Sequence, residues 1–346
     1  MRLRFVIIAI LCGTIAYIGY WHYVASNAPE HITAQIAKLQ EQRTTITYDQ
    51  METTGFPYRL IFAFDNPVVN MAGKGGALGW SSQRIELFAQ PWNLSHIIMS
   101  SGPSEFTSEA KAIQAGTMRT SAVLSDGVPT RVSIELNDAL IKHRNGGAMI
   151  SADTLGLHVR SKSISTPLKA DSGDRGLLLP AVADLALGAR EMAFGGKNAA
   201  ELEAIKEVTL LATLHGHKIP RYDADALAEW RDTGGTIEVS SLNIQLSGFQ
   251  IEASGSFSLD KDFRPIGALS ARVPEMESVY KLLGAFIYLN PESQTLLSAA
   301  LNLLKTFSPD GTIPLSITAQ DGILWLGPLE LMELAPIINP GPSSPN

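Results

Sequence analysis

Hydrophobic residues are spaced in three ways along this chain, and the first is an almost unbroken run. Residues 5–24 are apolar or aromatic except for a few small residues and His22, and Arg2 and Arg4 precede them. Twenty helical residues at ~1.5 Å each match a hydrocarbon core of ~30 Å. The run therefore predicts a transmembrane helix, and because flanking basic residues stay cytoplasmic, we expect the amino terminus inside and the bulk of the chain outside.

The alternative interpretation of this run is a cleaved signal peptide. Such a peptide has a shorter apolar core and a small-x-small cleavage site. Residues 26–28 fit that site weakly, because Pro29 would follow the cut. We interpret residues 1–27 as a cytoplasmic stub and a retained anchor, with cleavage as the open alternative.

The second spacing has period two and dominates the rest of the chain. Pro29 indicates the first turn of a helix reaching to about Arg43, and short segments of alternating apolar and polar residues follow. The clearest are residues 60–65, 132–136, 208–214 and 236–259. They predict antiparallel strands, with hairpins of the Asp-Gly kind, as at Asp321-Gly322. The alternation slips at Ser240-Ser241 and at Gly248, and each slip predicts a turn, twist or bulge.

The third spacing is helical. It covers residues 180–192, 223–232, 276–288 and 292–307. Asp223 is a typical helix cap, and the last two segments are strongly apolar. We predict a mainly β (α+β) fold: a transmembrane helix, then a large antiparallel, curved β-sheet body with a few covering helices.

A polar loop around residues 167–176 suggests a division of the body. The predicted parts are a β-rich half with a leading helix (28–175), a second β-rich half containing the apolar helices 276–307 (176–335), and a disordered Pro- and Ser-rich tail (336–346).

Composition excludes several classes of chemistry. The only cysteine is Cys12, inside the apolar run, so the body has no disulfide, Cys-based metal site or thiol nucleophile. The formal net charge is -7, and no basic run exceeds two residues, which argues against a nucleic-acid partner. Charged residues make up only 18%, so much of the surface is expected to be neutral and polar.

Several short sequence motifs, taken together, resemble those of a known family. They are the Gly55-Phe56-Pro57-Tyr58-Arg59 phrase, the Trp230 to Val239 phrase, Gly255 to Asp260 with Arg264 to Gly267, and Asp321 to Pro328. They resemble an uncharacterised envelope family of alphaproteobacteria, domain of unknown function 2125, over nearly the whole chain. The resemblance implies an inner-membrane single-pass anchor, a periplasmic β-rich body and no assigned chemistry. The Leu-Asp and Gly-x-Leu phrases are also loosely similar to AsmA-type lipid-conduit proteins.

Candidate chemistry is sparse. The chain has no Gly-x-Ser-x-Gly, Walker or His-Glu-x-x-His motif. His215-x-His217 could place two imidazoles on one strand face for a metal, but surface histidines at a strand end explain the pair better. We therefore predict no enzyme, cofactor or metal site, and we interpret five residues as structural: Gly55, Phe56, Pro57, Trp230 and Gly235.

The balance of strands to covering helices suggests a ligand. An apolar sheet face cannot stay in water, so the sheet either packs on itself or curls around an apolar occupant. We expect a lipid-binding groove that serves envelope maintenance, with phospholipid as the possible ligand. Its predicted lining is Leu296, Leu297, Leu301, Leu304, Phe249 and Ile251. The alternative is a ligand-free scaffold that binds other envelope proteins through its sheet edges.

Overall fold

The computed structural model confirms a mainly β, antiparallel fold that follows a long amino-terminal helix. It describes residues 2–41, 44–73, 76–108, 111–143, 149–162, 179–195, 205–221, 223–246, 248, 250–273, 295, 298–299, 313–327 and 329–338. The chain forms two compact units, Met1–Val132 and Ser133–Asn346. The division falls within strand β11 (Val128–His143), whereas the boundary predicted near residue 175 lies outside the described residues.

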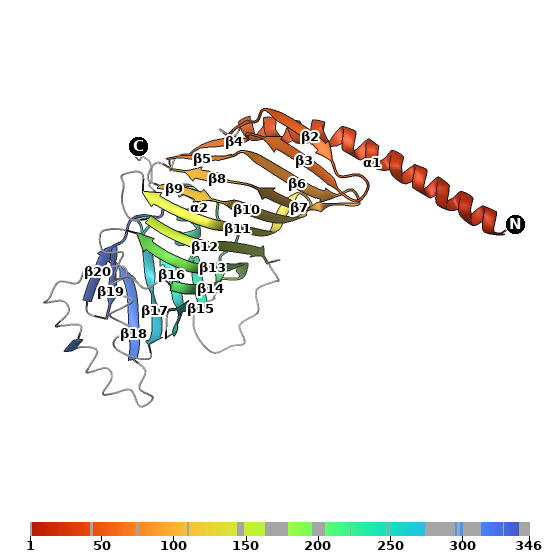
Figure 1. Cartoon of the computed structure of the whole chain (residues 1–346). Helices are drawn as coiled ribbons and strands as arrows, with labels where there is room; N and C mark the ends of the chain where they lie inside the picture. The colour runs from red at the N-terminus through yellow and green to blue at the C-terminus, as the bar shows by residue number, and fades with distance from the viewer. Residues whose placement is uncertain are drawn as a thin grey trace. The chain divides into compact units, whose positions relative to one another are not determined.

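Helix α1 (Arg2–Glu41) is continuous and includes Pro29 (Figure 1). The helix predicted from Pro29 to about Arg43 is therefore confirmed as far as Glu41, but its predicted start at Pro29 is wrong. A proline inside a helix removes one backbone hydrogen bond. Here Val24, Ala25, Ala28 and Ile32, on both sides of the proline, pack against the core of the first unit, which supports the helix across this position.

The first unit contains ten short strands. They are β1 (Thr44–Thr47), β2 (Gln50–Thr54), β3 (Leu60–Asp65), β4 (Val68–Gly73), β5 (Gly76–Ser82), β6 (Arg84–Gln90), β7 (Asn93–Ser101), β8 (Ser104–Thr107), β9 (Lys111–Ala115) and β10 (Thr117–Ser125). Their antiparallel pairings form two ladders with matching order, β2-β3-β6-β7-β10 and β1-β4-β5-β8-β9. Each strand of one ladder continues into a strand of the other after an interruption of one or two residues.

Polar groups satisfy the backbone where these strands are interrupted. Asn66 donates its backbone N–H to the carbonyl of Gln83 at 2.8 Å and its side-chain amide to Asp49 at 2.8 Å. Ser101 and Ser104, both buried, share a hydrogen bond of 2.8 Å between their hydroxyls. Buried polar groups are costly unless they are hydrogen-bonded. These bonds therefore stabilise the chain at the points where one strand ends and the next begins.

The second unit is a meander with helix α2 (Ala224–Asp232) inserted between β14 and β15. Its remaining strands are β12 (Met149–Ser161), β13 (Ala181–Gly195), β14 (Ile205–His215), β15 (Thr236–Gln245), β16 (Gln250–Leu259), β17 (Pro265–Val273), β18 (Ile313–Gln320), β19 (Ile323–Leu326) and β20 (Leu329–Glu333). Each pairs antiparallel with the next one in the chain. Alternate residues such as Ile251, Val273 and Ile313 are buried together on one face of this sheet.

Three local predictions in this unit have clear outcomes. The Asp321-Gly322 hairpin is confirmed, with both residues at positive φ between β18 and β19. The slip at Ser240-Ser241 is a bulge in β15, and Gly248 lies at positive φ between β15 and β16. The helix predicted over residues 180–192 is wrong, because this segment is strand β13 and its backbone groups pair with β12 and β14 on both sides. Tertiary pairing here overrides the helical preference of an Ala-rich segment.

Of the other predicted elements, the capped helix is confirmed, and the rest lie largely outside the described residues. Asp223 caps α2 and accepts the backbone N–H of Ala226 at 2.8 Å, as predicted. The apolar helices predicted over residues 276–307 lie almost wholly outside the described residues, and the predicted disordered tail largely does too.

Candidate functional site: an apolar groove between helix α1 and the first sheet

The sheet face of the first unit that α1 covers is apolar because of strand alternation. Leu60, Phe62 and Phe64 point to this face from β3 and pair with Ala89, Leu87 and Ile85 on β6. Phe62, Phe64 and Ile85 are buried, and Leu60 is fully buried. Side chains at every second position of a strand share one face, so the predicted alternation in residues 60–65 is the origin of this surface.

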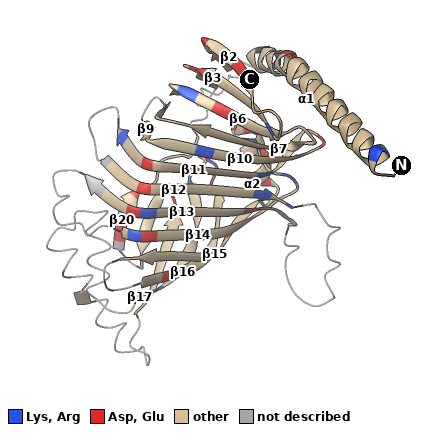
Figure 2. Cartoon of the chain, turned by 45° about the vertical axis from the view of Figure 1, so that its right-hand side comes forward, with Lys and Arg blue, Asp and Glu red and all other residues tan. Residues whose placement is uncertain are grey.

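The same strands also carry charged residues (Figure 2), which alternate with the apolar ones and so lie on the opposite face. Arg84 of β6 forms ion pairs with Asp65 at 2.7 Å, Glu52 at 3.4 Å and Glu86 at 3.7 Å. Its hydrogen bonds to Asp65 and Glu52 raise the pKa of Arg84. The charges keep this face in solvent, which leaves the apolar face as the one that α1 covers.

Aromatic residues on α1 fasten the helix to two turns of the sheet. Trp21 is buried and donates its indole N–H to the carbonyl of Arg59 at 3.1 Å. The Tyr17 hydroxyl donates to the carbonyl of Pro57, and the Tyr20 hydroxyl donates to the carbonyl of Pro91 at 2.9 Å. The helix therefore holds the β2–β3 turn and the β6–β7 turn at fixed points along its length.

Beyond Trp21, the helix and the sheet enclose an apolar groove of about 480 Å³. Its lining comes from α1, β3, β6 and the start of β7. The residues are Tyr23, Val24, Asn27, Ala28, His31, Ile32, Leu60, Phe62, Leu87, Ala89, Leu94 and Ile97. Ala28 and Ala89 are small, so the helix and the sheet do not close on each other here. The volume lies within the range of ~300–1,000 Å³ typical of ligand sites.

None of the described residues predicted to line a groove borders the groove beside α1. Phe249, Leu296, Leu297, Leu301 and Leu304 are outside the described residues. Ile251 is buried in the core of the second unit, next to neighbours such as Val273 and Ile313. Sequence reasoning missed the groove beside α1, and the available signal was the stripe of apolar residues continuing past Pro29 to Ile32.

Three of the residues interpreted as structural form the β2–β3 turn. Gly55 has φ of 105°, and a Cβ there would lie 2.6 Å from the carbonyl oxygen of Arg59. Phe56 packs edge-on against Trp21 with ring centroids 5.3 Å apart, and its ring stacks on His22. Pro57 carries the carbonyl that accepts from Tyr17. The turn is thus shaped to receive the helix.

The other two form a closed joint in the second unit. Trp230 of α2 is buried and donates its indole N–H to the carbonyl of His215 at 2.8 Å. A Cβ on Gly235 would overlap the indole ring, and one on Gly216 would lie 2.9 Å from it. Only glycine permits the backbone to approach the ring this closely.

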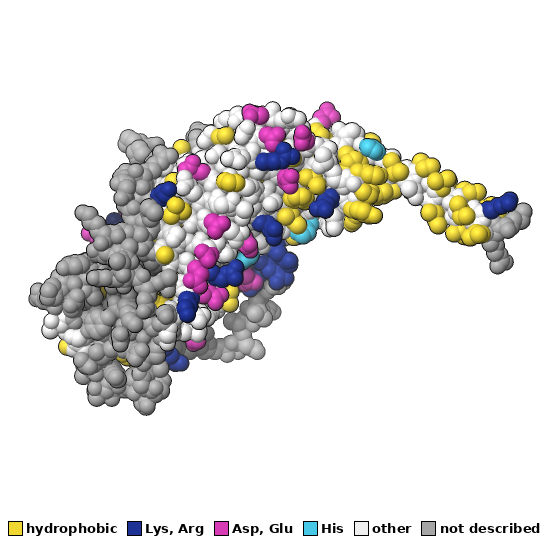
Figure 3. Space-filling model, in the orientation of Figure 1, with side chains coloured by type: hydrophobic (Ala, Val, Ile, Leu, Met, Phe, Trp, Pro, Cys, Tyr) yellow, Lys and Arg dark blue, Asp and Glu magenta, His cyan; other side chains and the backbone are white. Residues whose placement is uncertain are grey.

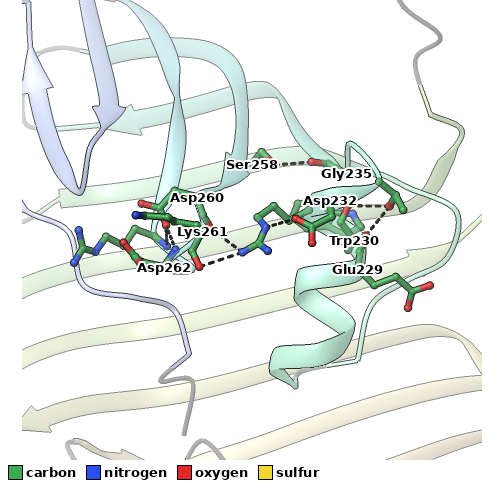
Figure 4. A network of polar contacts seen from close by, with 11 residues as sticks. Glu229, Trp230, Asp232, Gly235, Ser258, Asp260, Lys261 and Asp262 are labelled. Atoms are coloured by element: carbon green, nitrogen blue, oxygen red, sulfur yellow. Dashed lines mark hydrogen bonds and ion pairs between the residues drawn. The ribbon is translucent and has the colours of Figure 1, made fainter. Parts of the chain in front are cut away.

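Polar contacts extend this joint to the Asp260–Arg264 turn (Figure 4). Arg231 donates to the carbonyls of Asp260 and Lys261 at 3.1 and 3.2 Å and lies over the ring of Phe263. Asp260 accepts the backbone N–H groups of Asp262 and Arg264, both at 2.8 Å. The hydrogen bond from Arg231 lowers the pKa of Asp232. The segments Trp230–Val239 and Gly255–Gly267 therefore contact each other, and these contacts stabilise the fold.

The candidate histidine pair is not arranged as a metal site in the described part of the chain. His215 contacts the carbonyl of Leu179 at 2.9 Å through Nδ1 and Glu238 at 3.2 Å through Nε2. His217 lies beside a small cavity next to Trp230. Among the residues that the structure describes, no three His, Cys, Asp or Glu side chains form a cluster that could hold a metal.

A second hollow lies on the solvent face of the second sheet. It measures about 800 Å³ and extends over β15 to β18. Cross-strand neighbours Ser254, Ser270 and Ser316 contribute hydroxyls, and Glu252 lies opposite Arg272. About half of its lining is polar, whereas the lining of the groove beside α1 is mainly apolar.

The fold defines a class of protein in which one long amino-terminal helix precedes an antiparallel β-sheet body. In this chain the helix and the sheet border an apolar groove. That helix is the one span in the described residues long and apolar enough to cross a membrane. The chain belongs to the family described as "Uncharacterized protein conserved in bacteria (DUF2125)", whose model matches residues 21–335. This match confirms the family predicted from the Gly55 and Trp230 phrases. No curated protein and no solved structure matches the chain.

Proposed function

We propose that this protein is anchored in the inner membrane by α1, with its body in the periplasm, and that it binds the acyl chain of a phospholipid in the groove beside α1. Binding would shield or hold lipid for envelope maintenance. The loose similarity of its Leu-Asp and Gly-x-Leu phrases to AsmA-type lipid-conduit proteins agrees with such a role.

The apolar lining of the groove is the observation that carries this proposal. Nine of its twelve lining residues have wholly apolar side chains, and the other three are Tyr23, Asn27 and His31. An apolar surface in a half-open groove is costly in water and favours an apolar occupant. The few polar groups lie on the helix, where they could contact an ester or a headgroup.

The position of the groove along α1 supports the bilayer as the source of the lipid. Its helical lining begins at Tyr23, at the end of the apolar run of residues 5–24. If this run crosses the bilayer, the groove opens directly above the hydrocarbon layer. A lipid tail could then enter without crossing bulk water. The two basic residues before the run support an orientation with the body in the periplasm.

We propose binding and not catalysis as the role of this groove. Its polar side chains are those of Tyr23, Asn27 and His31. A nucleophile with a positioned base, which acyl or phosphoryl chemistry requires, is lacking among the groove-lining residues.

Photocrosslinking tests the proposal directly. The full-length protein is reconstituted in vesicles with a phosphatidylethanolamine that carries a diazirine near the end of one acyl chain. We expect adducts on residues 23–32 and 87–97. Ala89→Trp should fill the groove and remove most of these adducts, while Gln90→Trp, one position along β6, should leave them unchanged because Gln90 is exposed and does not line the groove.

Two outcomes would contradict the proposal. Equal adduct yields in wild type and folded Ala89→Trp would place the lipid outside the groove. A ligand-free mass for the wild-type protein in native mass spectrometry, together with no adducts, would favour the alternative of a scaffold that binds other envelope proteins through its sheet edges.

A further inference from the structure

We infer that the edge of the first sheet next to α1 rests in the interfacial layer of the bilayer, so that the protein contacts the membrane through two strand turns as well as through its helix. We name this surface the aromatic edge and define it as Phe56, Tyr58, Trp92 and Leu94. Its partner is a phospholipid bilayer surface. The inference goes beyond lipid binding in the groove and shares with it the membrane-spanning role of α1 and one residue, Leu94.

The aromatic edge consists of exposed side chains from two neighbouring turns. Phe56, Tyr58, Trp92 and Leu94 are 48%, 76%, 58% and 52% exposed. The β2–β3 and β6–β7 turns lie at the same end of the sheet, because Leu60 at the start of β3 pairs with Ala89 at the end of β6. Figure 3 shows hydrophobic side chains gathered where α1 meets the sheet and continuing along the helix. Exposed apolar clusters of this kind mark interaction surfaces, and aromatic rings favour the headgroup level of a bilayer.

The hydrogen bonds to α1 set the height of these turns relative to the bilayer. Pro57, Pro91 and Arg59 accept from Tyr17, Tyr20 and Trp21. Tyr17 precedes Val24, the end of the apolar run, by seven residues or about 10 Å of helix. A crossing of ~30 Å uses nearly the whole run, so Trp21 and Tyr20 lie ~5 Å, and Tyr17 ~10 Å, inside its end, which places them where the interface meets the hydrocarbon layer. The turns bound to them must then reach the same level.

The backbone of the turns is suited to that level. An unpaired backbone group is costly close to hydrocarbon. Pro57 and Pro91 have no N–H, and both carbonyls accept tyrosine hydroxyls from α1. In the β2–β3 turn, the backbone N–H of Arg59 is also bonded to the carbonyl of Gly55 at 3.1 Å.

Charge at this edge is complementary to phospholipid headgroups. No Asp or Glu occurs in residues 53–64 or 87–104, which include both turns. Arg59 is the one lysine or arginine in these segments, and it is exposed. Acidic residues are confined to the parts of these strands away from the turns, such as Glu52, Asp65 and Glu86, where they pair with Arg84. An edge with aromatic rings and an arginine but without acids fits an anionic or zwitterionic lipid surface.

Depth measurements on the full-length chain test this inference. Cys12→Ser removes the only cysteine, and single cysteines are then placed at Tyr58→Cys or Trp92→Cys and labelled with the environment-sensitive dye NBD. Met71→Cys is the matched control, because Met71 is a similarly exposed apolar residue on β4, in the ladder beyond the strand interruptions. The labelled proteins are reconstituted in vesicles of phosphatidylethanolamine and phosphatidylglycerol.

At positions 58 and 92 we expect blue-shifted emission and loss of most of it to a nitroxide attached to the lipid headgroup. At position 71 we expect emission typical of water and no quenching. Equal behaviour at all three positions would overturn the inference. Because the replaced side chains are exposed, the thermal unfolding temperature in detergent should not change, so misfolding can be recognised separately.

The result is distinguishable from that of the groove experiment. Ala89→Trp should abolish acyl-chain adducts but leave the depth of the labels at 58 and 92 unchanged. Conversely, Tyr58→Asp combined with Trp92→Asp should move these turns into water. Labels at Phe56→Cys in that background would then lose their blue shift, while adducts within the groove persist if the groove proposal is correct.

Discussion

Two helices in this molecule are each fastened to a strand end by one tryptophan, yet the spaces beside them differ greatly. Trp21 of α1 donates to the carbonyl of Arg59 at 3.1 Å, and Trp230 of α2 donates to that of His215 at 2.8 Å. Both rings are buried. The cavity beside Trp230 measures about 20 Å³, whereas the groove beside α1 measures about 480 Å³.

The difference lies in the residues that face each helix. Gly216 and Gly235 bring the backbone into direct contact with the Trp230 indole, so the joint is filled. Beside α1, the strands are held at the distance set by Leu60, Phe62 and Leu87, and the small side chains of Ala28 and Ala89 leave the intervening space open. A closed joint stabilises the fold, while an open one leaves apolar surface available to a ligand.

The largest loss of stability is expected from Trp230→Ala, at the closed joint. Removing a buried indole from a joint that cannot collapse should destabilise the second unit by ~3–5 kcal/mol. Unfolding of the full chain in detergent, with hydrogen exchange across β14 to β17 as the local measure, checks this. Trp230→Phe keeps most of the ring packing and should cost clearly less. Unchanged exchange in these strands would show that Trp230 does not support the joint.

A smaller effect is expected from adding one methyl group to the closed joint. Gly235→Ala should cost ~1–3 kcal/mol through overpacking against the indole. The matched control is Gly188→Ala in β13, where a Cβ meets only the carbonyl oxygen of Val208 at 4.0 Å. Its stability should be unchanged in the same unfolding assay. By contrast, the much larger Ala89→Trp change should be tolerated, because the groove beside α1 has room for it. Equal costs for the two alanine substitutions would contradict the close contact at Gly235.

The smallest change in stability is expected at a hydrogen bond that joins α1 to the first sheet. Tyr20→Phe removes one hydroxyl that donates to the carbonyl of Pro91, and should cost ~1 kcal/mol. We expect faster hydrogen exchange in residues 92–95 of the reconstituted protein. Tyr23→Phe, at a position 68% exposed, serves as the control and should leave that exchange unchanged. Faster exchange in both variants would point to a general effect of losing a hydroxyl on α1.

Local patterns in the sequence were sufficient for elements whose structure depends on neighbouring residues. The alternation of Leu60, Phe62 and Phe64 predicted which face of β3 is buried, and the slip at Ser240-Ser241 predicted a bulge. The Asp223 cap and the Asp321-Gly322 hairpin followed from side-chain and backbone preferences within a few residues.

Elements that depend on distant partners were predicted less well. Residues 180–192 have a helical composition, but β12 and β14 supply partners for both edges of the segment and make it strand β13. Pro29 indicated a helix start, but packing against the sheet carries α1 through it. The groove was missed for the same reason, since its lining combines α1 with β3, β6 and β7.

The sequence by itself determined the apolar span, the antiparallel strand pattern and the family. These features are encoded by spacing and by short phrases, because helix length, strand alternation and glycine conformation are local properties. Only the tertiary structure decided which joint is closed and which is open. That outcome depends on how far apart facing side chains hold two elements, and such distances arise when segments distant in the chain pack together.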